Sequence, residues 1–147
     1  MNEILEKLNN VKNKILGKKK GSVFYFFGLV ERTDLENKWD LLIGADWLEK
    51  ENQEKDLVFF IEEIKSELGS DFDLISKIVL FTSDEEFLLA LGRALSKEEE
   101  SKTEFFNLKL MDNFALKHLY VIDRNFDSLE LGEELLVSDH VERPADF

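Results

Sequence analysis

Two apolar runs separated by a charged loop decide the fold: Val23-Phe24-Tyr25-Phe26-Phe27 and Trp39-Asp40-Leu41-Leu42-Ile43-Gly44-Ala45. The first run is rich in β-forming residues and lacks polar alternation, which is typical of a strand covered on both faces. The loop over residues 31–38 is short and polar, so we expect the two runs to pair as an antiparallel hairpin. The hairpin therefore predicts a sheet with both faces buried.

Three helices are predicted around this hairpin. The first has apolar residues at the spacing of one helix face and ends near Gly17 and the lysines that follow it; these residues are Ile4, Leu8, Val11 and Ile15. The second helix is predicted over about residues 53–68, with Gly69 ending it. The third opens at Ser83, because Ser83 and Glu86 form a capping-box pattern.

Three further strands are predicted over residues 77–81, 106–110 and 115–122. In the second of these, Phe106, Leu108 and Leu110 alternate with polar residues, which predicts that they share one half-buried face. The order α-β-β-α-β-α-β-β predicts an α+β fold with helices packed on a mixed, largely antiparallel sheet. We expect one domain over residues 1–125 and an acidic C-terminal segment over 126–147 that is partly ordered at most.

Composition and charge exclude several classes of protein. The 147 residues include no Cys, so disulfides and thiolate metal sites are excluded. No apolar run approaches the ~20 residues that cross a bilayer, so we expect a cytoplasmic protein. The net charge is −13, and because residues 1–20 carry +4 the rest carries −17. Such a charge disfavours nucleic acid and membrane surfaces and attracts basic protein partners.

The stretch from Phe26 to Ile43 resembles the core of the minimal nucleotidyltransferases. In that family a strand ends in Gly-Ser and the next carries Asp-x-Asp, which holds divalent metals against a triphosphate. Gly28 matches the turn glycine and Asp40 the second carboxylate, whereas Leu29 and Lys38 replace the serine and the first carboxylate. The strand over 77–81, where the family's third carboxylate belongs, has none. Asp40 is thus the one weak metal candidate.

A lysine beside a lone aspartate favours an internal ion pair over a metal site. The alternative interpretation of this stretch is structural, with Gly28 at a β-bulge, Trp39 packed on a helix and Asp40 a surface carboxylate on an edge strand. No catalytic residue or cofactor is assigned. His118 and His140 are too far apart to predict a zinc site, and His118 is expected to be partly buried with a hydrogen-bond partner.

Two features indicate a partner-binding surface. Asp46, Trp47 and Glu49 place an aromatic ring among carboxylates, a suitable anchor for a basic partner; the alternative is that Trp47 caps the core. In the C-terminal segment, Glu133 and Glu134 precede an apolar centre, and such a segment can fold against a positive surface.

Three functions remain open. The first is a non-catalytic partner-binding protein that covers a basic surface, such as an antitoxin; the chain also resembles small uncharacterised prokaryotic proteins described as antitoxins. The second is a nucleotidyltransferase-fold enzyme or nucleotide-binding protein that uses Asp40, with Asp34, Glu36 and Asp46 as the nearest further carboxylates. The third is a self-associating structural domain, a homodimer joined through the first helix or the Phe-rich strand.

Overall fold

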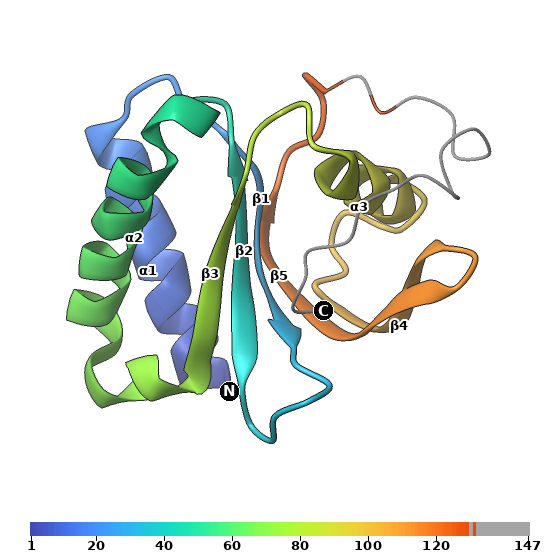
Figure 1. Cartoon of the computed structure of the whole chain (residues 1–147), viewed down its shortest axis with the longest axis horizontal. Helices are drawn as coiled ribbons and strands as arrows, with labels where there is room; N and C mark the ends of the chain where they lie inside the picture. Colours follow the sequence, from blue (N-terminus) through green and yellow to red (C-terminus); the bar gives the residue numbers. More distant parts are fainter. Residues whose placement is uncertain (130, 132–147) are drawn as a thin grey trace.

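A five-stranded mixed sheet separates two layers, as the computed structural model shows (Figure 1). The structure describes residues 1–129 and Leu131. The helices and strands follow in the predicted order: α1 (Asn2–Lys18), β1 (Phe24–Glu31), β2 (Trp39–Ala45), α2 (Gln53–Leu68), β3 (Ile75–Phe81), α3 (Glu86–Ser96), β4 (Glu104–Met111) and β5 (Phe114–Arg124). Two short 3₁₀ turns, η1 (Lys50–Asn52) and η2 (Gly69–Leu74), flank α2.

The strand order β3-β2-β1-β5-β4 confirms the predicted α+β class. β2 and β3 run parallel, and the other neighbours are antiparallel. β1 and β2 form the expected hairpin and lie inside the sheet with both faces covered, which explains why neither run alternates with polar residues. No helix among the described residues has the length and apolar character needed to cross a bilayer.

Helices α1 and α2 cover one face of the sheet (Figure 1). The four apolar residues of α1 are at most 6% exposed, so they belong to the chain's own core rather than to a seam between two copies. The lysines of α1 pair with carboxylates on α2 and on the turn after it, at Lys7–Asp71 (3.0 Å), Lys14–Glu67 (3.6 Å) and Lys18–Glu63 (2.5 Å). Part of the positive charge of the N-terminal helix is therefore paired with carboxylates of α2 and η2.

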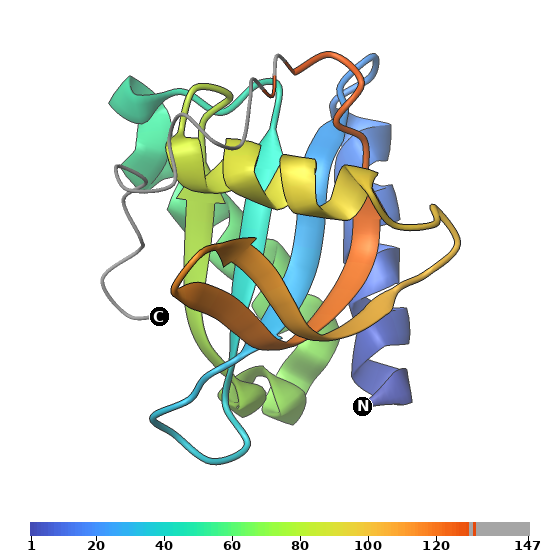
Figure 2. The same ribbon diagram turned by 90° about the vertical axis from the view of Figure 1, so that its right-hand side faces the viewer.

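Helix α3 lies on the opposite side of the sheet. The β4–β5 hairpin belongs to the sheet but curves over this same side and lies across the other strands (Figure 2). Phe26 of β1 belongs to this second core and stacks on Phe126 with ring centroids 6.4 Å apart. Gly92 of α3 makes room for that ring, since a Cβ there would lie 2.8 Å from Phe126. Phe126, just beyond β5, thus packs against the core between the sheet and α3.

Helix α3 begins later than its capping pattern predicts. Its first residue is Glu86, and Ser83 is not its cap. Thr82 and Glu85 instead bond reciprocally: the Thr82 amide donates to the Glu85 carboxylate, and the Glu85 amide donates to the Thr82 carbonyl, each at 3.2 Å. Thr82 is buried at the end of β3, so the sheet fixes its position, whereas Ser83 is exposed.

Strand β4 breaks the predicted alternation. Leu108 and Leu110 are buried as expected, but Phe106 is 66% exposed on the other side. The cause is Asn107, whose φ of 53° lies in the left-handed region. With this conformation Phe106 and Asn107 are both exposed. The buried side chains of the strand therefore change from an odd position before Asn107 to even positions after it.

Candidate functional site

Gly28 lies in the middle of β1 and not in a turn. A Cβ at this position would be 2.4 Å from the carbonyl oxygen of Tyr120 on β5 and 2.6 Å from the ring of Phe26. The pairing of β1 with β5 shifts register between Phe27 and Gly28, as a β-bulge does. Glycine is therefore required here for close strand packing, and the position offers no turn that could receive a phosphate.

Asp40 is fully buried on an interior strand, so its interpretation as a surface carboxylate on an edge strand is wrong. Arg32, at the end of β1, brings its guanidinium within 3.3 Å of one Asp40 oxygen and 3.4 Å of the other. The same guanidinium binds Asp34 at 2.7 and 2.9 Å. The hydrogen bonds that Arg32 donates to Asp34, together with the negative charge of Asp40, raise the pKa of Arg32 above its ordinary value.

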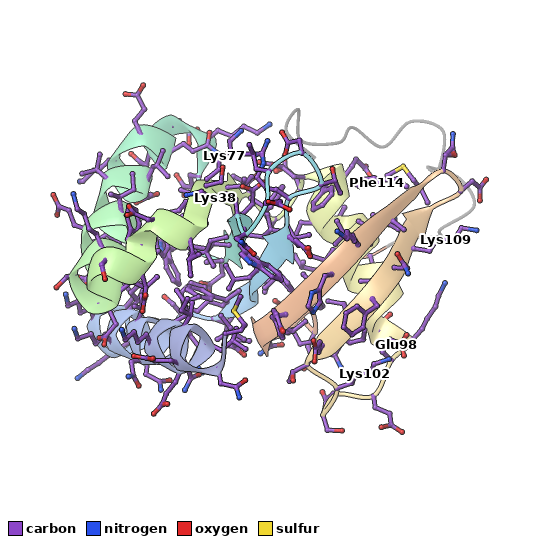
Figure 3. All side chains as sticks on the ribbon, turned by 90° about the horizontal axis from the view of Figure 1, so that it is seen from below. Lys38, Lys77, Glu98, Lys102, Lys109 and Phe114 are labelled. Carbon is purple, nitrogen blue, oxygen red and sulfur yellow. The ribbon has the colours of Figure 1, made fainter. Side chains whose placement is uncertain are left out.

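The predicted ion pair of Asp40 therefore forms with Arg32. The Lys38 ammonium instead donates to the Asp73 carbonyl in η2. Lys77 is the register neighbour of Asp40 on β3, and Figure 3 labels both lysines. Asp40 thus has three basic neighbours: Arg32 in direct contact, Lys38 two residues earlier in the chain, and Lys77 beside it on β3. Their positive charge opposes the binding of a divalent cation. Among the described residues, no three His, Asp or Glu side chains lie close enough to share a metal ion.

Trp47 packs on the core below its loop. Its ring lies 5.1 Å from Phe24 and 6.4 Å from Phe60, and the chain's own Lys19 sits over it at 5.5 Å. A cation–π contact is thus already made within the chain, which favours the core-capping alternative. Its indole nitrogen is buried and meets no acceptor in the part of the chain that the structure describes.

The carboxylates near Trp47 lie apart from its ring face. Asp46 accepts a hydrogen bond from the Val23 amide at 3.1 Å, which ties the two ends of the β1–β2 hairpin together. Glu49 is exposed before η1. Glu133 and Glu134 lie outside the described residues, as does His140.

The structure assembles a different surface from residues that the sequence left separate. Phe106, His118 and Tyr120 stand side by side on β4 and β5, with Trp39 of β2 behind them, and two carboxylates border these rings. We call this set the Phe106 surface; it comprises Glu31, Trp39, Glu104, Phe106, His118 and Tyr120. Seen from below, the β4–β5 hairpin lies in front of α3 (Figure 3), and Phe106 and Glu104 of β4 are exposed to solvent.

The rings of the Phe106 surface are in close contact. Phe106 stacks on His118 with centroids 4.3 Å apart and planes 21° apart. The His118 ring also lies 5.1 Å from Trp39 and 4.7 Å from Tyr120. His118 is partly buried, as expected, with 16% of its side chain exposed. Phe106 is the outermost ring of an ordered aromatic stack.

The carboxylates of the Phe106 surface are fixed by these rings. Glu104 lies 2.7 Å from His118 Nε2, and this hydrogen bond, supported by one from Tyr120, lowers the pKa of Glu104. Burial, followed by the hydrogen bond to Glu104, raises the pKa of Tyr120. Glu31 lies 3.8 Å from His118 Nδ1 and 3.4 Å from the Lys117 ammonium. Glu104 therefore stays ionised at neutral pH while 43% of its side chain is exposed.

One signal in the sequence could have located this surface. Phe105 and Phe106 are consecutive, so one of them must leave the buried face of any regular strand. The residue that follows is Asn107, and asparagine adopts the left-handed conformation more readily than most residues. The pairing of Phe106 with His118 depends on the register of β4 and β5, which the residues alone do not give.

A groove of about 530 Å³ runs along the outer edge of β4, between that strand and the end of α3. Its charged lining residues are three lysines and two acids, and Phe106 lines it as well; the charged residues are Lys97, Lys102, Lys109, Glu98 and Asp112. Figure 3 shows Lys102 and Glu98 near one end of the hairpin and Lys109 nearer the other. Lysines on an edge strand oppose pairing with a further strand.

Comparison of the chain with known protein families, with curated proteins and with solved structures finds no match.

Proposed function

We propose that this chain is a non-catalytic binding protein that covers a basic surface of a partner protein, as the antitoxin of a toxin–antitoxin pair does. The observation that carries the proposal is the Phe106 surface, where an exposed aromatic ring is bordered by ionised carboxylates. Aromatic residues that are partly exposed on a rigid sheet are typical anchors of protein interfaces. Carboxylates beside such an anchor select a partner of positive charge.

The distribution of charge supports the same partner. The net charge of −13 attracts a basic protein from a distance and raises the rate of encounter. The net charge already includes the lysines of α1, three of which pair with carboxylates of α2 and η2. The contact itself then forms where an aromatic ring can be buried, which on this chain is the exposed part of the β4–β5 hairpin.

The proposal is tested by co-expressing the chain with the basic protein encoded by the neighbouring reading frame and measuring the affinity of the purified pair by calorimetry. We expect a complex whose Kd rises by about tenfold or more between ~50 and ~300 mM salt, because charge attraction is screened. Replacing Glu31 and Glu104 together by Gln is expected to weaken the complex. Replacing Glu51 and Glu62, two exposed carboxylates elsewhere, removes the same charge and is the matched control.

Two results would refute the proposal. The first is that the purified chain forms no complex with that protein. The second is a complex that is indifferent to salt and responds equally to both double variants, because the Phe106 surface would then play no special part.

A further inference from the structure

Two features set Phe106 apart: its exposure to solvent and the backbone conformation of Asn107, the residue that follows it. The Phe106 side chain is the most exposed of the large apolar side chains in the described residues, at 66%. Its outward direction depends on Asn107 at φ 53°, a left-handed conformation that asparagine adopts more readily than most other residues with a Cβ. A regular strand would have placed Phe106 on the same face as Leu108 and Leu110. A left-handed residue that turns a large apolar ring toward solvent indicates a functional position.

The geometry around Phe106 selects the chemistry of what it binds. The phenyl ring lies nearly parallel to the His118 imidazole, which holds one side of the ring and leaves the other to solvent. Glu104 precedes Phe106 by two residues on the same strand, so both side chains project from one face. A flat ring with a carboxylate at its border is complementary to a planar cation that can stack and form hydrogen bonds at once.

We propose that the Phe106 surface is an arginine-binding site: a guanidinium of the basic partner stacks on the exposed face of Phe106 and pairs with the carboxylate of Glu104. This inference rests on the proposed function and specifies the partner's side chain. Arginine is favoured over lysine because its planar group stacks on an aromatic ring and binds a carboxylate through two N–H groups.

The charged residues around Phe106 determine where a guanidinium can bind. The groove along the outer edge of β4 is lined by Lys97, Lys102 and Lys109 and by only two carboxylates, those of Glu98 and Asp112, so positive charge is in slight excess there. The carboxylates of Glu104 on β4 and Glu31 on β1 both lie next to His118 of β5, and Glu31 is also paired with Lys117. Glu104, with 43% of its side chain exposed, is therefore the carboxylate beside Phe106 that the partner's arginine meets.

The site is tested by titrating the full chain, labelled with ¹⁵N, with two blocked peptides, Gly-Arg-Gly-Arg-Gly and Gly-Lys-Gly-Lys-Gly. We expect chemical-shift changes centred on residues 104–106 and 118–120, with the arginine peptide binding more tightly than the lysine peptide. Phe106→Ala is expected to raise the Kd for the arginine peptide by about two- to fivefold, which corresponds to the loss of an exposed cation–π contact. Val58→Ala removes another exposed apolar side chain (55%), on α2, and is the matched control.

Each outcome supports or refutes the site. Shifts spread over the carboxylates of α2, equal binding of the two peptides, or an unchanged affinity of Phe106→Ala would each overturn it. Glu104→Gln is a second variant that leaves the ring in place, and it is expected to reduce the preference for arginine. If the partner complex forms normally with Phe106→Ala, the arginine site is refuted while the proposed function stands; if no partner binds, the proposed function fails whatever the peptides do.

Discussion

Replacing Gly28 with Ala tests whether this glycine serves strand packing or a phosphate-binding turn. The added Cβ would lie 2.4 Å from the Tyr120 carbonyl oxygen, a backbone atom that cannot rotate away. Ordinary contact begins at 3.4 Å, so β1 and β5 would have to separate by about 1 Å, the difference between the two distances. That displacement strains the hydrogen bonds on either side of the bulge.

The expected loss of stability follows from these contacts. Overpacking of a filled site costs about 1–3 kcal/mol, and a weakened backbone hydrogen bond adds about 1 kcal/mol. The lower entropy of the unfolded Ala chain returns ~0.5–1 kcal/mol. We therefore expect Gly28→Ala to lower the free energy of unfolding by about 2–3 kcal/mol, or the melting temperature by roughly 10 °C in a chain of this length.

The matched control is Gly17→Ala. Gly17 lies within α1, and nothing is within 4 Å of a Cβ there. This variant is expected to gain ~0.5–1 kcal/mol, since Ala has the higher helix propensity. Chemical denaturation followed by circular dichroism measures both variants. Equal stability of Gly28→Ala and the wild type would refute the packing argument and favour a turn that receives a ligand.

Five further variants test the buried charge of Asp40, the titration of Asp123 and the left-handed backbone at Asn107. Asp40→Asn should cost about 3 kcal/mol and Asp34→Asn less than about 1 kcal/mol, because the same arginine pairs with both but only Asp40 is buried. Burial raises the pKa of Asp123, so its charge is unfavourable at neutral pH; Asp123→Asn should be more stable than wild type there, and the difference should vanish as pH falls through the folded-state pKa. Asn107→Val should cost about 1–2 kcal/mol, because a β-branched residue disfavours φ 53°, whereas Lys109→Val on the same strand should cost nothing.

Each of these variants has an outcome that contradicts its reason. Equal losses for Asp40→Asn and Asp34→Asn in denaturant titrations would mean that burial does not govern the pair. A stability difference for Asp123→Asn that grows at acid pH would reverse the sign of its titration. A neutral Asn107→Val would mean that β4 carries no strain at that residue.

The order of helices and strands could be predicted from the sequence because it depends on local periodicity. The spacing of Ile4, Leu8, Val11 and Ile15 defines α1, and unbroken apolar runs define β1 and β2. The strands predicted over residues 106–110 and 115–122 correspond to β4 and β5, which pair antiparallel across Asp112 and Asn113. These features were correct since each is set by residues close together in the chain.

The capping prediction failed for a reason that lies outside the local pattern. Ser83 and Glu86 have the right spacing, but so do Thr82 and Glu85, and the choice depends on where β3 ends. The sheet buries Thr82 and leaves Ser83 in solvent. A pattern of four residues cannot give that distinction, because it is made by the packing of β3 against its neighbours.

The sequence by itself determined the α+β class, the buried hairpin and the negative charge, since composition and short-range periodicity carry them. Only the tertiary structure decided that Asp40 is buried against Arg32, that Lys19 covers Trp47, and that Phe106 faces solvent beside His118 and Glu104. These contacts join residues that are distant in the chain or depend on the left-handed backbone of Asn107. Strand register and one dihedral angle therefore determine the candidate site, and neither quantity is encoded in residue type alone.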